Sequence, residues 1–363
     1  MTLFAWLVSF VLGGVGPSGQ IAFVSGTEQE DQCVCVVDLP TGTVTRVGPG
    51  QLDGAPVWSP DGTRLAFQTR NPEGLSICIA NPDDSGPQIL THAYKWNRNP
   101  RWSPDGVSLA YESDNGDTLD RRLVVYDTRS NVETPWGGER TGLMRPVWMP
   151  NLKILNTLRP EAEVQWGGDQ EGKPQGIDWL KGNAALLAIG LTGEPGQFQT
   201  DIFIVTEASA ATPSSRGAYV EWGAEPSPNG WDIAFESNDG GDREIFVLSR
   251  RVTADVSNHR AADWNPVWSP DGEWIAFESF RGGRRGVYRV YPETARVVPI
   301  AADPAVDNWA PTWSPDGLWI AFVSNRTGDS EIFASDVAGK NVRQVTDHPG
   351  LDCAPAWRPN GKK

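Results

Sequence analysis

Three histidines could support metal or acid–base chemistry, and they share one position of a repeat. His92, His259 and His348 fall ten, nine and nine residues before a tryptophan that recurs along the chain, which we call the marker. Imidazole nitrogens from equivalent loops could converge on a zinc ion. Recurrence at one repeat position is also what a structural preference of the loop produces, and we favour that interpretation. The sequence therefore predicts no metal site.

Other catalytic patterns are missing from the sequence. No Gly-x-Ser-x-Gly elbow occurs. Carboxylates lie close to glycines at 114–117 and 239–242, but their spacing is not that of a calcium loop, and we interpret both segments as hairpin turns. We predict no catalytic residue and no cofactor, so an enzyme is the less favoured class.

The loop before each marker is the better candidate for binding. Five residues before the marker six copies have Asp, Asn or Glu, which favours a backbone-capping role. The next position varies, and in three successive copies it is tryptophan. Aromatic side chains beside acids suit a peptide, protein or sugar ligand. The predicted binding residues are Asp53, Trp96, Asn97, Trp222, Asp263, Trp264, Asn308, Trp309 and Asp352.

These loops belong to a repeat marked by Trp-Ser-Pro-Asp-Gly. The pentapeptide stands at 58–62, 102–106, 268–272 and 313–317, with a variant at 357–361. Weaker copies are marked by Trp148, Trp179 and Pro226, which gives intervals of 44, 46, 31, 47, 42, 45 and 44 residues. Repeats of this length are typical of propellers and solenoids.

Each repeat reads as four short antiparallel strands. Ser-Pro-Asp-Gly is a tight turn, because Pro fixes φ and Gly takes the positive-φ position. An apolar strand such as 319–323 follows it, and polar turns separate two further strands. The sequence predicts an all-β fold, a β-propeller of four-stranded blades. Eight blades are preferred; seven follow if 148–226 is one blade with an insertion.

The two ends of the repeat region predict how the ring closes. Residues 21–23 match a second strand with no first strand before it, and 357–361 is a first strand and turn with no second strand after it. An open array would leave both edges unpaired. We expect the N- and C-terminal strands to pair in one blade.

Composition limits the partners and the cellular location. The formal net charge of the 363 residues is −15 with no basic run, so nucleic acid is an unfavoured partner. We expect a monomer. The four cysteines are Cys33, Cys35, Cys78 and Cys353; we interpret them as core residues, and a disulfide from Cys353 to the N-terminal blade is the alternative.

The apolar N-terminus, 1–19, resembles the hydrophobic part of a signal peptide. Its apolar stretch, 3–12, is too short for a stable membrane span. It lacks a basic residue before the apolar stretch and a clear cleavage site. We expect export to the periplasm or the extracellular space, with the propeller over 20–361.

The repeat Pro-x-Trp-Ser-Pro-Asp-Gly-x-x-Ile-Ala-Phe, followed by an Asn-x-x-Gly turn and Glu-Ile-Phe, resembles the TolB-type (WD40-like, PD40) propeller repeat. Residues 311–333 are the best copy. The resemblance implies a ring-shaped binding platform, often periplasmic or secreted. It leads us to expect a non-enzymatic scaffold for a protein or peptide. The alternatives are a glycan-active lyase or hydrolase with its site at the channel mouth, and a detached propeller domain of a larger receptor or peptidase.

Overall fold

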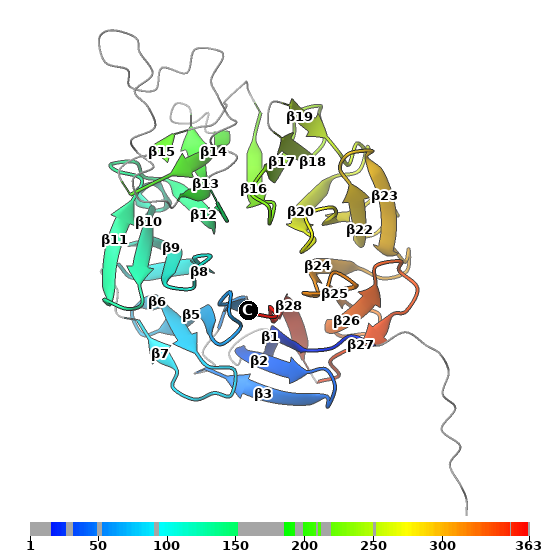
Figure 1. Cartoon of the computed structure of the whole chain (residues 1–363), viewed down its shortest axis with the longest axis horizontal. Coiled ribbons are helices and arrows are strands. Elements are labelled where there is room, and N and C mark those ends of the chain that lie inside the picture. The colour runs from blue at the N-terminus through cyan, green and yellow to red at the C-terminus, as the bar shows by residue number, and fades with distance from the viewer. Residues whose placement is uncertain are drawn as a thin grey trace, which may run out of the picture.

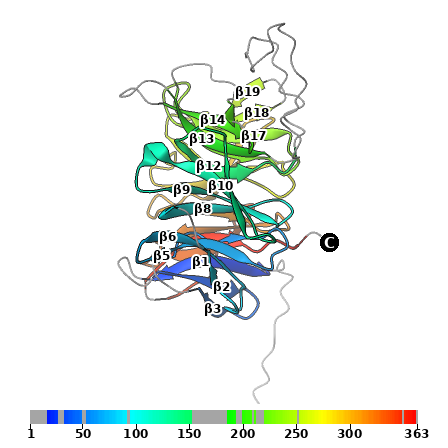
Figure 2. The same ribbon diagram turned by 90° about the vertical axis from the view of Figure 1, so that its left-hand side faces the viewer.

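A computed structural model of the chain describes residues 16–26, 32–48, 53–90, 94–151, 185–192, 199–207, 210–211, 219–249, 252–348 and 350–361. Apart from one helical turn, η1 (Thr118–Asp120), the regular structure of these residues is β-strand. Figure 1 shows the sheets arranged around a central axis, and Figure 2 shows the same disc from its edge. The predicted all-β propeller fold is confirmed.

The described strands fall into seven groups of four, which we call quartets. The first is β28 (Leu351–Trp357), β1 (Gln20–Gly26), β2 (Cys33–Asp38) and β3 (Thr43–Val47). The second is β4 (Val57–Trp58), β5 (Leu65–Asn71), β6 (Gly74–Ala80) and β7 (Gln88–Ile89). The third is β8 (Trp96–Trp102), β9 (Ser108–Asp114), β10 (Arg122–Asp127) and β11 (Val132–Trp136). A single parallel pair, Leu75 with Trp96, joins the second and third quartets.

The remaining quartets follow in chain order. The fourth is β12 (Leu143–Trp148), β13 (Leu186–Thr192), β14 (Gln199–Val205) and β15 (Ala210–Ala211). The fifth is β16 (Glu221–Pro226), β17 (Asp232–Ser237), β18 (Glu244–Ser249) and β19 (Val252–Asp255). The sixth is β20 (Asp263–Trp268), β21 (Ile275–Ser279), β22 (Gly286–Tyr291) and β23 (Arg296–Ala301). The seventh is β24 (Asn308–Trp313), β25 (Trp319–Ser324), β26 (Glu331–Asp336) and β27 (Arg343–Gln344). The first strand of each quartet is the innermost (Figure 1).

The fourth quartet corrects the reasoning behind the preference for eight blades. That preference treated Trp148 and Trp179 as markers of two separate sheets. In the structure Trp148 on β12 pairs with Leu186 on β13, so the intervening stretch lies between the first and second strands of one sheet. Trp179 itself lies outside the described residues. The strand pairing favours the alternative, one sheet with an insertion.

The second strand of each quartet is apolar on both faces because each sheet packs between two neighbours. Phe277 on β21 faces the fifth quartet, where it meets Ala234 and Val247, whereas Ala276 faces the seventh. Phe277 and its equivalents Phe23, Phe67 and Phe322 are fully buried. Burying an aromatic or aliphatic side chain of this size stabilises a fold by roughly 1.5–3 kcal/mol. A near-continuous apolar strand therefore marks the middle of each blade.

The predicted Ser-Pro-Asp-Gly turns are present with repeated geometry. In the seventh quartet the Gly317 amide donates to the Ser314 carbonyl at 2.9 Å, and the Ser314 hydroxyl donates to Asp316 at 2.5 Å. The same hydroxyl accepts the Trp319 amide at 2.9 Å. Gly317 has φ +71°, a conformation that suits glycine. Each turn therefore satisfies its own backbone groups.

The marker indoles bond from one quartet to the inner strand of the preceding one. The Nε1 of Trp313 donates to the Val267 carbonyl at 3.0 Å, and Trp268 donates to the Glu225 carbonyl at the same distance. Trp148 and Trp58 repeat the contact. In the third quartet the buried Nε1 of Trp102 has no partner among the described residues. The marker indole therefore donates a directed hydrogen bond to the preceding quartet in four places.

The terminal strands share one sheet, as predicted. Ile21 and Ala22 on β1 pair with Trp357 and Ala356 on β28. The Arg358 amide donates to the Gln20 carbonyl at 2.8 Å. All four cysteines are free in the structure, so no disulfide reinforces this sheet, although the Sγ atoms of Cys33 and Cys35 lie 3.6 Å apart.

Two marker tryptophans provide a matched test of the indole bond. We expect Trp313→Phe to lower the free energy of unfolding by about 1 kcal/mol more than Trp102→Phe, because only the former leaves a carbonyl without its donor. Urea denaturation followed by circular dichroism measures both. Equal losses in the two variants would contradict a stabilising role for the bond.

Candidate functional site

In five quartets the acid or amide five residues before the marker is buried and bonded within the protein. Asp53 and Asn97 are each 1% exposed. The hydroxyl of Thr69 donates to Asp53 Oδ1 at 2.6 Å, and Asn97 Nδ2 donates to the Leu75 carbonyl at 3.0 Å. Both side chains join the inner strand to neighbouring strands, as the capping interpretation requires.

Three equivalent side chains behave in the same way. Asp263 forms an ion pair with Arg281, and Arg326 donates to Asn308 Oδ1 at 2.9 Å. Asp352 lies 3.4 Å from His348 Nδ1. Asp263, Asn308 and Asp352 are at most 1% exposed. The structure thus gives this position a positioning role, and direct contact of these five side chains with a ligand stays a prediction.

The predicted tryptophans are sequence neighbours of this acid or amide position. Trp222, Trp264 and Trp309 follow it directly, and Trp96 precedes it. All four are half-buried. The guanidinium of Arg285 lies 5.6 Å from the Trp264 ring centroid and 5.5 Å from that of Trp309, so it brings the two rings together. Trp222 stacks with Arg243 at 4.4 Å. Trp96 contacts Arg98 on its own strand, and no ring contact joins it to the other three within the described part of the chain.

Three glutamates on the second strands complete this region, and the sequence analysis missed them. Glu112, Glu236 and Glu278 are at most 3% exposed and each forms an ion pair with an arginine that begins or precedes the third strand of its own quartet. Each also accepts a backbone amide from the next inner strand, at 2.7 Å from Arg145, 2.7 Å from Asn265 and 2.9 Å from Ala310. We call these contacts carboxylate bridges.

A sequence signal for the bridges exists. Each glutamate follows an aromatic residue and precedes a serine, in the tripeptides at 111–113, 235–237 and 277–279. An arginine stands seven or nine residues later, at Arg243 and Arg285 or at Arg121. The amides that the carboxylates accept are 29–33 residues away in another sheet, so sequence spacing alone does not indicate them.

The channel mouth, which we define by Trp222, Trp264, Trp309 and their arginine partners, is therefore rigid before any ligand arrives. Charge-assisted hydrogen bonds are about twice as strong as neutral ones. They fix the arginines, and the arginines fix the tryptophan rings through cation–π contacts. The arrangement presents flat aromatic surface with little rotamer freedom, which suits binding and offers no nucleophile with an adjacent base.

Three further glutamates have raised pKa values. Burial raises the pKa of Glu221 and of Glu225 to about 7. Burial, followed by the charge of Asp263, raises the pKa of Glu244 to about 8. All three carboxyls therefore hold a proton at a pH at which an unfolded glutamate has lost it.

The histidines of the repeat serve the loops that contain them. The amides of His259 and His348 donate to Glu244 at 3.2 Å and to Glu331 at 3.1 Å. His92 lies outside the described residues. Among the residues with assigned structure, no group of three metal-ligating side chains occurs.

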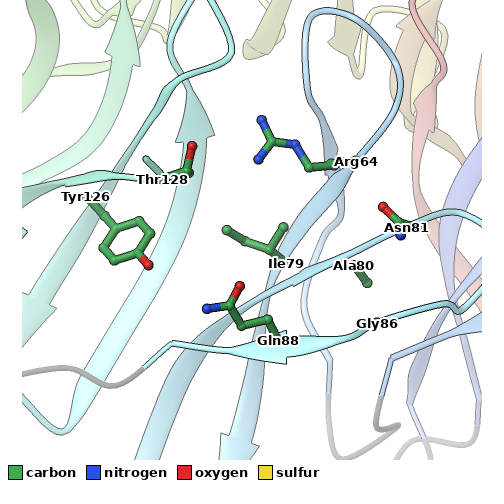
Figure 3. Close-up of a pocket in the computed structure, with 8 residues that line it drawn as sticks. All are labelled: Arg64, Ile79, Ala80, Asn81, Gly86, Gln88, Tyr126 and Thr128. Carbon is green, nitrogen blue, oxygen red and sulfur yellow. The ribbon is translucent and has the colours of Figure 1, made fainter. Parts of the chain in front are cut away.

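A cavity of about 160 Å³ lies between the second and third quartets, away from the predicted binding residues. Figure 3 shows Gln88 from β7 and Tyr126 from β10 on two sides of it, with Arg64 nearby. Tyr126 donates to Asn131 at 2.7 Å and Arg64 donates to the Gly106 carbonyl at 2.8 Å. Both of these polar side chains are thus engaged within the protein, and we do not favour the cavity as the main site.

Comparison with known proteins identifies the fold. No family model matches the chain. A 47-residue stretch is 45% identical to the Tol-Pal system protein TolB of Gluconobacter oxydans, covering 13% of this chain and 10% of that relative. The TolB structure from Acinetobacter baumannii aligns with a TM-score of 0.53 at 16% identity, over 93% of this chain and 82% of the other. The fold is a TolB-like β-propeller.

Propellers of peptidases share this fold. The β-propeller domain of the trilobed protease from Pyrococcus furiosus, described as having an open velcro topology, aligns with a TM-score of 0.66 at 13% identity over 92% and 94% of the chains. Acylaminoacyl peptidase from Pyrococcus horikoshii aligns with a TM-score of 0.60 at 13% identity, over 91% of this chain and 51% of the peptidase. This chain therefore spans about half of the peptidase.

The helical turn η1 is three residues long, so the described residues contain no helix able to cross a bilayer. The apolar segment 1–15 lies outside those residues, and its assignment as a leader stays a prediction.

The raised pKa values predict how stability depends on pH. A carboxyl whose folded pKa lies above the unfolded value binds more protons in the folded state, so stability falls as pH rises from about 4.5 to about 8. Thermal melting at intervals across this range measures the fall. We expect it to be smaller in Glu244→Gln, because the amide stays neutral beside Asp263, and unchanged in the exposed control Glu139→Gln. Stability that rises over this interval would contradict the assignment.

Proposed function

We propose that this protein is a non-enzymatic scaffold that binds a protein or peptide at the channel mouth. The observation that carries the proposal is the set Trp222, Trp264 and Trp309, which are the second residues of three successive inner strands and are each half-buried. Large aromatic side chains held in one conformation lose little entropy on binding and dominate many interfaces. The carboxylate bridges supply that rigidity.

We further propose that the quartets are seven blades of one ring sealed by the β28–β1 sheet. The pairing of Ile21 with Trp357 supports the seal. An exported monomer, delivered by the apolar segment 1–19, fits this scaffold. The TolB structure among the similar folds supports a location in the bacterial envelope.

The second candidate is a propeller that works beside a peptidase domain. The peptidase propellers that align over nine-tenths of this chain favour it. In that arrangement the mouth would admit or select peptide substrates. Co-expression with peptidases of the source organism, followed by size-exclusion chromatography, separates the two: a stable complex favours this candidate. A glycan-active enzyme predicts turnover on a glycan panel.

Removing the three tryptophans tests the scaffold directly. We expect the triple variant Trp222→Ala, Trp264→Ala, Trp309→Ala to capture partners from envelope or culture fractions at less than a tenth of the wild-type yield. Loss of an aromatic hot spot costs about 2 kcal/mol or more in binding free energy. Quantitative mass spectrometry of the captured proteins measures the effect.

Two controls separate binding from folding. The triple change to Phe keeps apolar rings and should retain the fold and part of the binding. The double variant Leu318→Ala, Val132→Ala removes exposed apolar side chains elsewhere and should bind as wild type. Capture by the folded alanine variant equal to that of the wild type would remove the mouth as the binding face.

A further inference from the structure

Arg145, on the inner strand of the fourth quartet, stands at a repeat position where the other quartets have smaller residues. In six quartets the inner strand has a bulge, and the residue three positions before the marker has a positive φ. The residues at this position in six quartets are Asn99, Arg145, Gly223, Asn265, Ala310 and Ala354. Positive φ is uncommon for residues other than glycine and asparagine and is strained for a long side chain. Arg145, with φ +52°, is the only long charged residue among them.

The guanidinium of Arg145 lacks an acidic partner in the described residues, and the side chain is exposed. Nearby arginines differ: Arg121 pairs with Glu112, and Arg243 pairs with Glu236. Glu112, which accepts the Arg145 amide, and Glu236 are thus already paired with other arginines. The Arg145 Nη1 lies 3.7 Å from the point where a Cβ on Gly223 would stand, and Glu236 Oε1 lies 3.1 Å from the same point. The guanidinium therefore projects toward β16 beside Trp222, near a carboxylate that already pairs with Arg243.

The fourth quartet also lacks a carboxylate of its own at this place. The bridging position on its second strand is Ile189, which is 2% exposed and cannot accept a hydrogen bond. A carboxylate bridge joins the third quartet to the fourth and the fifth to the sixth. The fourth quartet has no glutamate at the bridging position to make the same contact to β16, and the Arg145 guanidinium lies on that side of β12.

A second unpaired arginine lies on the adjacent inner strand. Arg101 on β8 is exposed, and no acidic side chain lies within ion-pair distance of it in the described residues. Burial raises the pKa of Glu225 on β16 to about 7 and the charge of Arg101 opposes that rise, so Glu225 is the acid that this cation faces within the protein. The indole of Trp148 donates to the Arg101 carbonyl at 3.0 Å, which fixes β8 beside β12. Two cations thus stand on neighbouring inner strands of a protein whose net charge is −15.

We propose that Arg145 and Arg101 bind carboxylates of an acidic peptide segment that enters the channel mouth. This inference rests on the proposed peptide-binding function and specifies its ligand. A guanidinium pairs with a carboxylate in a bidentate geometry. The negative surface repels an acidic peptide elsewhere, so the pair fixes where it binds and in which orientation.

The test uses a fluorescein-labelled peptide that contains six glutamates, and the matched peptide with six glutamines. Fluorescence anisotropy with the full chain measures both. We expect the glutamate peptide to bind at least tenfold more tightly at low salt, with the advantage reduced at 0.5 M salt, since exposed charges are screened. Arg145→Gln and Arg101→Gln should each weaken it about tenfold, or about 1.4 kcal/mol. The exposed control Arg129→Gln should leave the affinity unchanged.

The variant Arg145→Asn separates binding from stability. Asparagine tolerates positive φ, so this variant should melt at or above the wild-type temperature and still lose the glutamate preference. Equal binding of both peptides, or equal losses in Arg145→Gln and Arg129→Gln, would overturn the inference. The proposed function would survive either result if the tryptophan triple variant still lost its captured partners. It would fail as well only if that triple variant kept them.

Discussion

Hydrogen bonds that pass from one sheet to the next hold the inner strands, and the rest of the architecture depends on them. An inner strand pairs with its own sheet along one edge only, so its other edge would present free backbone groups. The marker indoles occupy some of these carbonyls, as Trp313 does at Val267. The carboxylate bridges occupy amides on the same strands, as Glu278 does at Ala310. Neighbouring sheets thus satisfy groups that an isolated blade could not.

The same contacts prepare the binding face. Each bridge uses one carboxylate for two tasks, since it accepts an amide from the next sheet and pairs with an arginine of its own. That arginine then lies against tryptophan rings, as Arg285 does against Trp264 and Trp309. Packing between neighbouring sheets and order at the mouth therefore have a common origin. Similarity to TolB and to peptidase propellers identifies the fold, and the proposed function rests on the residues of the mouth.

Local chemistry made much of this fold predictable from sequence. Pro, Asp and Gly specify the turn after each marker, and the buried aromatic nine residues later specifies the second strand. The pairing of the two ends followed from their incomplete repeats. The pairing of Trp148 with Leu186 in one sheet was less accessible, because the long stretch between them resembles a separate repeat in its spacing.

The site was predicted in part, for a physical reason. Tryptophans at one repeat position can be read from spacing, whereas the bridges join residues that come together only after two sheets pack. Arg145 gave no signal because nothing in its sequence neighbourhood indicates a positive φ.

Amide hydrogen exchange at the bulge residues tests the central claim most directly. Arg145 and Asn265 have exposed side chains, yet each amide donates to a buried carboxylate at 2.7 Å. Residue-resolved exchange measured by NMR should show both amides, and that of Ala310, protected as strongly as amides of the paired second strands. Exchange of these three amides at the rate of exposed loop amides would contradict the bridges and the ordered mouth built on them.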